Sequence, residues 1–207
     1  MSRTKEKILK QSLILFNDQG LDHVSLRSIS NALNMSVGNL QYHFKKREDI
    51  IHELYFQLVS TIDIAIENSG NTQSKLEEFF ETTAAIVNCF YEYRFIFQDF
   101  TSVMNQHEAI RTHYQELMKN RKLQFSAFIG SLIKRNLMRK ELLPNEYDHL
   151  FVRFQILSDF WMSSSLIELE KVAQKEVSMY TEMIHQTIFP YLTETGKEAY
   201  LMIQKSI

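Results

Sequence analysis

The chain has little of what β-proteins, phosphate-binding loops and disulfide-bonded domains need. It holds 5 Gly and 2 Pro among 207 residues, whereas sheets with tight turns and Gly-rich loops usually need more of both. A single cysteine, Cys89, excludes an intramolecular disulfide and any metal cluster built from several cysteines. No apolar run approaches the roughly 18 residues of a membrane span, and the polar N-terminus is not a signal peptide. We therefore expect a soluble, cytoplasmic and mostly helical protein.

The overall composition is that of a globular protein, and the two parts of the chain differ in charge. Hydrophobic residues make up 44% and charged residues 23%, with 15 Phe, which excludes intrinsic disorder. Residues 1–50 hold 8 basic and 5 acidic residues, whereas residues 51–207 hold 15 basic and 20 acidic ones. A head of charge +3 on a body of charge −5 suits contact with nucleic acid; chance variation of a few charges is the other interpretation.

The spacing of apolar residues predicts three helices in the first 50 residues and a fourth that leaves them. The predicted spans are residues 4–18, 26–33, 37–44 and 48 onward. Gly20 is a natural stop for the first helix. Ser25 and Ser36 are placed to cap the second and third. Glu48 and Asp49 suit the positive end of the fourth, which we expect to cross into the body.

Two short helices joined by the tight connection at Asn34 and Met35 predict a helix-turn-helix. The second of these helices would enter the major groove of DNA. Leu40 and Phe44 are spaced to anchor it to the core, which leaves Asn39, Gln41, Tyr42 and His43 for DNA. Asn and Gln can form paired hydrogen bonds with adenine. Lys45 and Lys46 suit phosphate oxygens, and Gly38 would permit a close approach.

After the loop-like stretch at residues 68–72, every segment of the body has a helical pattern. Helices are predicted at about 75–91, 95–105, 108–139 and 146–172, then one ending near Tyr191 and a tail at 198–205. Ser74 and Glu77 have the form of a capping box. We predict an all-α protein with a DNA-binding domain at residues 1–50 and a regulatory domain at residues 51–207.

Residues 8–55 resemble the DNA-binding domain of the tetracycline-repressor-like (TetR) family of bacterial transcription regulators. The resemblance is carried in order and spacing by Ile8-Leu9, Leu15-Phe16, Gly20, Ser25-Leu26-Arg27-Ser28-Ile29, Met35-Ser36-Val37-Gly38, Leu40, Tyr42-His43-Phe44 and Lys45-Lys46-Arg47-Glu48. It implies a homodimer of nine or ten helices per chain and a ligand pocket in the body. It also implies that the ligand changes the spacing of the two heads and releases DNA.

The resemblance places DNA contacts at the start of the second helix, on the recognition helix and at the start of the fourth. In this chain these residues are Ser25, Leu26, Arg27, Ser36, Val37, Gly38, Asn39, Gln41, Tyr42, His43 and Lys46, to which the basic run adds Lys45. Two positions depart from the family pattern. Gln41 stands where an aromatic phosphate contact is common, so it could read a base instead. Lys46 stands at a usual Ser or Thr cap and cannot cap.

The middle of the body is rich in aromatic and Met side chains. These could line a pocket for a small apolar or aromatic ligand, or they could simply be core. The candidate ligand-binding residues are Phe97, Phe100, Met104, His107, Tyr114, Met118, Phe125 and Trp161.

Catalytic and metal-binding motifs are lacking, so we expect no enzyme activity, cofactor or metal. His107 and His113 do not share a helical face, and Ser158-Asp159 has no matching third group. We predict a ligand-responsive regulator, a repressor that binds a palindromic operator as a homodimer and is released by a small molecule. The alternative is a helical enzyme or small-molecule-binding protein whose head is a structural or protein-interaction module.

We expect the dimer interface on the helix at 146–172 and on the helix ending near Tyr191. The first carries apolar residues over more than one face, a wider arc than packing on a single neighbour requires. Phe154 and Ile188 are the predicted outward-facing residues.

Overall fold

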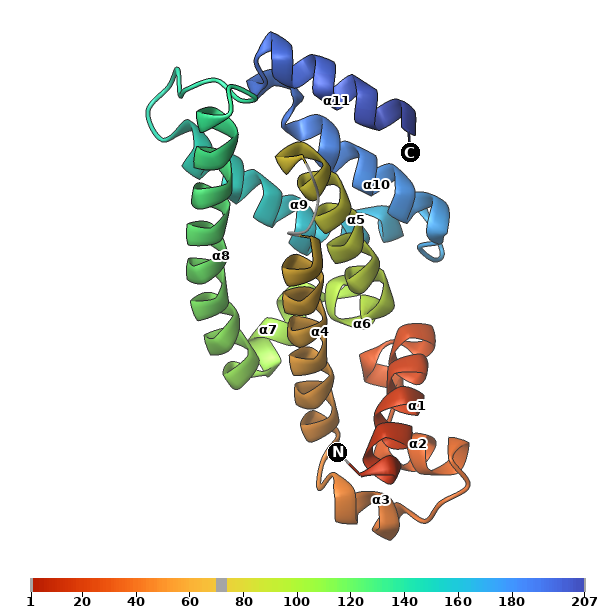
Figure 1. The fold of residues 1–207 in the computed structure, drawn as a ribbon. Helices are drawn as coiled ribbons and strands as arrows, with labels where there is room; N and C mark the ends of the chain where they lie inside the picture. Colours follow the sequence, from red (N-terminus) through yellow and green to blue (C-terminus); the bar gives the residue numbers. More distant parts are fainter. Residues whose placement is uncertain (1, 70–73, 207) are drawn as a thin grey trace.

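The computed structural model describes residues 2–69 and 74–206, which form eleven α-helices and two short 3-10 helices without a β-strand (Figure 1). This confirms the all-α prediction. The α-helices are α1 (Arg3–Gln19), α2 (Leu26–Ala32), α3 (Val37–His43), α4 (Arg47–Ser69), α5 (Lys75–Glu92), α6 (Arg94–Gln98), α7 (Phe100–Gln106), α8 (Glu108–Lys134), α9 (Glu146–Glu168), α10 (Gln174–Thr187) and α11 (Glu194–Ser206). Much of the predicted loop at 68–72 lies outside the described residues. None of the described helices is long and apolar enough to span a membrane.

The head consists of α1, α2, α3 and the first turns of α4, packed around one apolar cluster. Ile8, Phe16, Ile29, Leu40 and Ile50 have no exposed surface. They come from all four helices, so each helix contributes an apolar stripe to the same centre. Burying them stabilises the head by about 1.5–3 kcal/mol per side chain.

Helix α4 continues from the head into the body, as predicted, and packs against both α1 and α5 (Figure 1). Its first part faces the head core through Ile50 and Leu54, and its later part faces the body through Leu58. A continuous helix transmits rotation and translation better than a loop would. The orientation of the head is therefore tied to the packing around α4.

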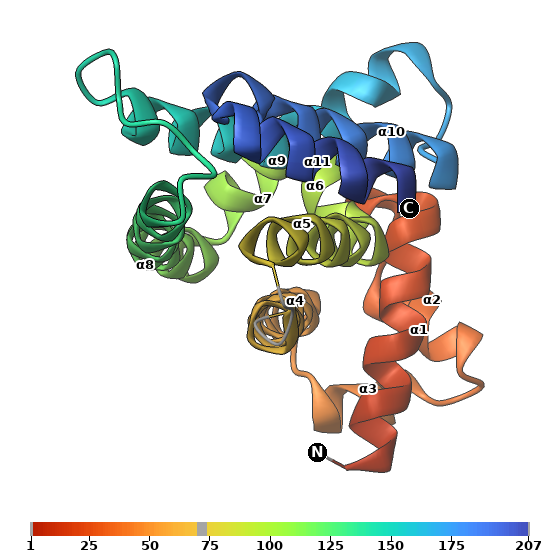
Figure 2. The same cartoon turned by 45° about the horizontal axis from the view of Figure 1, so that its top comes forward.

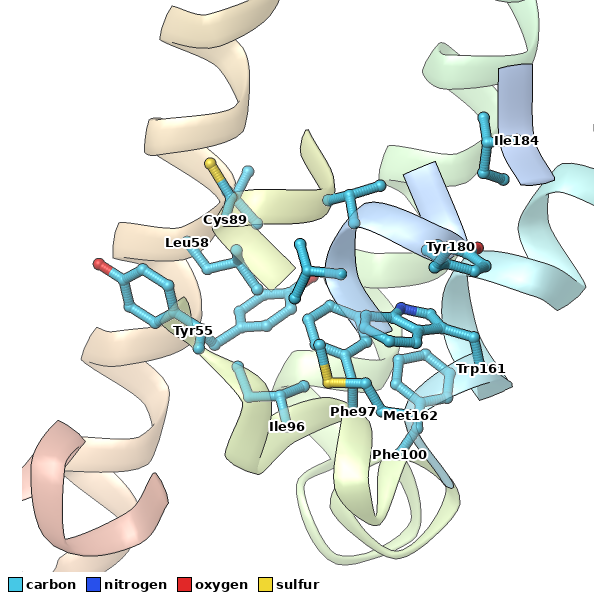
Figure 3. Packing of buried hydrophobic residues seen from close by; sticks show 14 of the residues in the cluster. Tyr55, Leu58, Cys89, Ile96, Phe97, Phe100, Trp161, Met162, Tyr180 and Ile184 are labelled. Carbon is cyan, nitrogen blue, oxygen red and sulfur yellow. The ribbon is translucent and has the colours of Figure 1, made fainter. Parts of the chain in front are cut away.

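The body core is aromatic and joins α4, α5, α6, α9 and α10 (Figure 3). Trp161 of α9 stacks on Tyr180 of α10, with ring centroids 4.4 Å apart and planes 6° from parallel. Phe97 and Phe100 stack beside them at 6.0 Å. Aromatic pairs of this kind add about 0.5–1.5 kcal/mol to their area burial.

The single helix predicted at 95–105 is two helices, α6 and α7, divided at Asp99. The backbone of Asp99 leaves the helical region, with φ −137° and ψ 55°. Ser163 of α9 donates its hydroxyl to the carbonyls of Phe97 and Gln98, at 2.9 and 3.1 Å. These are carbonyls that the end of α6 leaves without helical partners, so packing against α9 stabilises the break.

The predicted helix at 108–139 ends earlier, at Lys134, because the residues after it form backbone hydrogen bonds with the segment just before α11. Asn136 adopts a left-handed backbone with φ 57°. The Arg139 N–H donates to Tyr191 O at 2.9 Å, and the Thr193 N–H donates to Leu137 O at 3.1 Å. This pairing positions α11 along α5 (Figure 2). The tail helix accordingly begins at Glu194, four residues before its predicted start.

The outward face of α9 and α10 is apolar, but it is not made by the residues predicted. Ile188 is fully buried, and Phe154 packs against Phe79 and Phe125. Both were expected to face outward and do not, because Ile188, directly after α10, turns into the body core and α9 turns Phe154 toward α5 and α8. The exposed apolar side chains here are Val152, Ile156, Phe160 and Ile167 on α9 and Met179 and Met183 on α10.

Candidate DNA interface and body sites

The geometry between α2 and α3 depends on a left-handed residue and two serine caps. Asn34 has φ 51°, a conformation that Asn tolerates better than most residues. The Met35 N–H then donates to Ser30 O at 3.0 Å. Ser36 caps α3 by accepting from the Asn39 N–H at 3.2 Å. The angle between the two helices is therefore fixed locally, which a recognition helix requires.

A reciprocal capping box starts α2. The Ser28 N–H donates to Ser25 Oγ at 3.2 Å, and the Ser25 N–H donates to Ser28 Oγ at 2.9 Å. Ser25 and Ser36, both predicted to contact DNA, thus also have a role in the fold. Replacing either by Ala would cost about 1 kcal/mol of stability apart from any effect on DNA.

The recognition helix turns Leu40 and Phe44 into the core, as predicted, and leaves its polar side chains outside. The Tyr42 side chain is 85% exposed, although Tyr is usually at least half buried. The predicted DNA-contacting residues Ser25, Arg27, Ser36, Gly38, Asn39, Gln41, Tyr42, Lys45 and Lys46 are exposed, and Leu26, Val37 and His43 are half-buried. They lie on the two short helices and on the connection to α4.

Gly38 is not required by the fold. A Cβ placed on it would meet no atom within 4 Å, and its backbone φ is not in the left-handed region. Gly costs about 0.5–1 kcal/mol in a helix relative to Ala. Its presence on the outer face of α3 agrees with a surface that another molecule approaches closely.

Lys46 occupies the N-cap position of α4, where its side chain cannot cap. Asp49 makes the reciprocal bond of a capping box: its Oδ2 accepts from the Lys46 N–H at 3.0 Å. The next residue, Arg47, donates Nη1 to Leu21 O at 2.8 Å and to Val24 O at 3.3 Å. Arg47 therefore serves the fold of the head, whereas Lys45 and Lys46 remain exposed.

A contact that the sequence analysis missed joins the head to the body. Asn17 of α1 donates Nδ2 to Glu92 O at 2.7 Å and accepts from the Phe95 N–H at 3.1 Å. It thereby bridges the break between α5 and α6. Phe16 packs on Phe95 beside it, with centroids 5.3 Å apart. The head is thus attached at two places, through α4 and through this clamp.

The candidate ligand-binding residues are distributed through the body core. Phe97, Phe100, Met104 and Trp161 are buried. Phe100 packs against Tyr114 of α8 at 5.3 Å and against Phe97 at 6.0 Å, which joins three of the candidates. Phe125 lies further along α8 against Phe151 and Phe154. His107, Tyr114 and Met118 are half-buried, and burial lowers the pKa of His107.

A buried carboxylate lies beside these aromatic rings. Asp159 of α9 is 7% exposed. Tyr114 donates its hydroxyl to Asp159 Oδ2 at 2.6 Å and accepts from Gln155 Nε2 at 3.2 Å. Burial raises the pKa of Asp159 to about 6, against the Tyr114 hydrogen bond, which lowers it. Residue spacing gave no sign of this pair, because Tyr114 and Asp159 come from different helices.

Groups of three or more His, Cys, Asp or Glu side chains with the geometry of a metal site are not found among the described residues. Two cavities occur elsewhere in the body. One, of about 450 Å³, lies between α5, α10 and α11. The other, of about 500 Å³, lies between α8, the segment after it and the start of α9.

Known proteins match both parts of the chain. The family model described as "Bacterial regulatory proteins, tetR family" matches residues 8–54, and the model described as "Bacterial transcriptional repressor" matches residues 57–200. The "Probable HTH-type transcriptional regulator YttP" of Bacillus subtilis is 27% identical in an alignment of 106 residues that covers 47% of this chain and 51% of that protein. The matched part thus spans about half the length of this curated relative.

Solved structures show the same fold. A TetR-family transcriptional regulator from Marinobacter aquaeolei has a TM-score of 0.85 at 21% identity, over 99% of this chain and 98% of the other. A putative transcriptional regulator from Saccharomonospora viridis, solved in complex with choline, has a TM-score of 0.70 at 16% identity, over 94% and 100%. Family members are regulators rather than enzymes, which argues against the helical-enzyme alternative. The chain belongs to the TetR family of bacterial transcription regulators, with a helix-turn-helix head on an all-helical body.

Proposed function

We propose that the protein is a homodimeric repressor that binds a palindromic operator and is released by a small molecule. The observation that carries DNA recognition is the outer face of α3, where Asn39, Gln41 and Tyr42 are exposed beside Lys45 and Lys46. A short helix with exposed amides, followed directly by two exposed lysines, suits the major groove and its phosphates. The operators of such a regulator are on the chromosome, so we infer that it acts in the cytoplasm.

The apolar face of α9 and α10 supports the homodimer. Val152, Ile156 and Phe160 follow one another at helical spacing on α9, and their exposed fractions are 41–55%. On α10, Met179 and Met183 are similarly exposed. Exposed apolar side chains gathered along a helix in this way suit an interaction surface. A two-fold dimer would cover the same patch on both subunits.

The dimer and the charge distribution together define the DNA that should bind. Two heads related by a two-fold axis require a palindromic site. Since each chain carries a net charge of −2, attraction to DNA must come from the basic head. The affinity should therefore fall steeply as salt rises.

Release by a small molecule rests on the family and on the space inside the body. The Saccharomonospora viridis protein of the same fold was solved in complex with choline, a small molecule. Asp159, Tyr114 and the neighbouring aromatic rings provide polar and apolar surfaces in the body core.

A substitution on the apolar face tests the assembly. In Ile156→Asp each subunit would bury an unpaired carboxylate at the interface, at a cost of several kcal/mol. Light scattering after size exclusion should show a monomer or an aggregate, and palindrome binding should be lost. The matched control is Ile64→Asp, an exposed Ile of α4, which should stay dimeric. A dimeric Ile156→Asp variant that binds DNA normally would place the interface elsewhere.

A selection of bound fragments followed by mobility shifts tests the DNA function. Asn39→Ala and Gln41→Ala should each cost about 1–3 kcal/mol of binding and relax the sequence preference. Asymmetric or single-stranded fragments as the preferred ligands would refute a palindromic operator. Binding that is unchanged by both substitutions would show that α3 is not the recognition helix.

A further inference from the structure

The cavity between α5, α10 and α11 is lined by none of the candidate ligand-binding residues predicted from the sequence. It measures about 450 Å³, within the range of small-molecule sites. Phe80 and Ala84 of α5 and Val177 of α10 form its apolar walls. Glu182 and His185 of α10 and Tyr200 of α11 are polar groups on its lining. Helices α10 and α11 both pack on α5, as Figure 2 shows.

Tyr200, on the lining of this cavity, has a buried and unsatisfied hydroxyl. The side chain is 2% exposed, and its hydroxyl has no hydrogen-bond partner among the described residues. The ring itself is held firmly, 5.0 Å from Phe80 and 5.0 Å from Phe189. A buried hydroxyl without a partner costs about 1–3 kcal/mol. A ligand that bonds to it would recover this free energy.

His185 contributes an acceptor. Burial lowers the pKa of His185, so the ring is neutral at neutral pH. Its Nε2 lies 3.3 Å from Phe80 O and 2.7 Å from Thr83 Oγ1. The carbonyl can only accept, and the Thr83 hydroxyl already donates to Phe79 O at 2.7 Å. Nε2 therefore carries the hydrogen. Nδ1 is left as an acceptor with no partner among the described residues.

The charge of the lining selects against anions. Among the described residues that line the cavity there is no Lys or Arg, and the carboxylate of Glu182 is the one formal charge. Glu182 Oε1 accepts from Gln186, so Oε2 remains available. The lining thus offers a carboxylate, a neutral imidazole acceptor and a phenol. These groups favour a ligand that donates N–H hydrogen bonds and carries a positive charge. An anion would meet no compensating charge.

We propose that this cavity binds a small organic cation that has N–H donors and an apolar group, with Glu182 as its counter-ion and Tyr200 and His185 as hydrogen-bond partners. Phe80, Ala84 and Val177 contact the apolar group. The proposal concerns binding alone. Whether the bound cation alters DNA affinity depends on the ligand-responsive regulation proposed above.

Three probes of the same shape test the ligand class by calorimetry on the full chain: benzamidine, benzamide and benzoate. Benzamidine is a cation with N–H donors, benzamide is its neutral counterpart, and benzoate is an anion. We expect saturable benzamidine binding, about tenfold weaker binding of benzamide, and no binding of benzoate. Equal affinities, stronger binding of benzoate, or no saturation by about 10 mM benzamidine would overturn the proposal.

Paired substitutions test the location. Glu182 is exposed, so Glu182→Gln, which keeps the shape and removes the charge, should weaken benzamidine binding by about two- to fivefold. Tyr200→Phe should weaken it several-fold. The matched control is Glu198→Gln, an exposed Glu of α11 that does not line the cavity, and it should bind as wild type does. Binding unchanged by Glu182→Gln and Tyr200→Phe would place the site elsewhere. If benzamidine binds in the cavity but does not change the affinity of the protein for DNA, the site is supported and regulation by such a ligand is refuted.

Discussion

Replacing Asp159 by Asn should remove the pH dependence that this buried carboxylate imposes on stability. Burial raises the pKa of Asp159 from 3.8 to about 6. The folded state therefore favours the protonated form. The stability that this group contributes is fully present below pH 3.8 and is lost as the pH rises through about 6. Asn keeps the shape and an oxygen that accepts from Tyr114, but it does not ionise.

The magnitude follows from the pKa change. At 1.36 kcal/mol per pKa unit, a change from 3.8 to about 6 corresponds to about 3 kcal/mol. Near pH 4 the wild type and Asp159→Asn should be similarly stable. Above pH 7 the variant should be more stable by up to about 3 kcal/mol. Urea unfolding at fixed protein concentration, followed by the fluorescence of Trp161, the one tryptophan in the chain, measures this.

The comparison of variants separates Asp159 from other titrating groups. Burial lowers the pKa of His107 and His185, so their contribution to stability rises with pH toward 6.5, in the opposite direction. Both histidines are present in wild type and variant and cancel in the difference. Asp148→Asn, on the same helix but half exposed and paired with Lys122, is the control. A difference between wild type and Asp159→Asn that is flat with pH would refute the reasoning.

Three further predictions concern Gly and Lys positions. Gly38→Ala should raise the stability of the head by about 0.5–1 kcal/mol, as measured by thermal unfolding. The same variant should bind DNA more weakly, and an unchanged DNA affinity would show that α3 does not approach DNA at this position. Gly196→Ala should cost about 2–3 kcal/mol, since its Cβ would lie 1.9 Å from Leu137 O, whereas the control Gly130→Ala, with open space around it, should be neutral or stabilising. Lys46→Ala should weaken all DNA sequences alike and lower the salt slope by about one; a change of specificity would contradict its assignment to phosphate.

The starts of the helices that have a serine N-cap could be predicted from the sequence because this signal is local. Ser25, Ser36 and Ser74 each accept from a backbone N–H two or three residues later. The exposed face of α3 was predictable for the same reason: Leu40 and Phe44 fix its orientation through helical spacing alone. The head required no information beyond its own 50 residues.

Helix ends and body sites depended on contacts distant in sequence. The break at Asp99 is stabilised by Ser163, and the end of α8 is followed by pairing between Leu137 and Thr193. Ile188 was predicted to face outward because spacing along a helix identifies an apolar stripe without saying which neighbour covers it. The cavity joins residues from α5, α10 and α11, which no local pattern could bring together.

The two attachments of the head should together fix the spacing between the heads of the proposed dimer. Asn17 joins α1 to Glu92 and Phe95, at the end of α5 and in α6, while α4 is the covalent connection. With one attachment the head could pivot, whereas two restrict it to moving with α5. Helix α5 also lines the cavity between α10 and α11, so a shift of this helix would reach the head through the clamp.

Asn17→Ala should therefore leave the head folded and its binding to a single half-site unchanged, at a cost of about 1–2 kcal/mol in overall stability. Its preference for one distance between half-sites should broaden. Mobility shifts on palindromes with base pairs inserted between the half-sites measure this. Asn68→Ala, an exposed Asn near the end of α4, is the control and should retain the wild-type preference. If Asn17→Ala shows the same dependence on spacing as the wild type, the Asn17 hydrogen bonds contribute only to stability and do not set the orientation of the head.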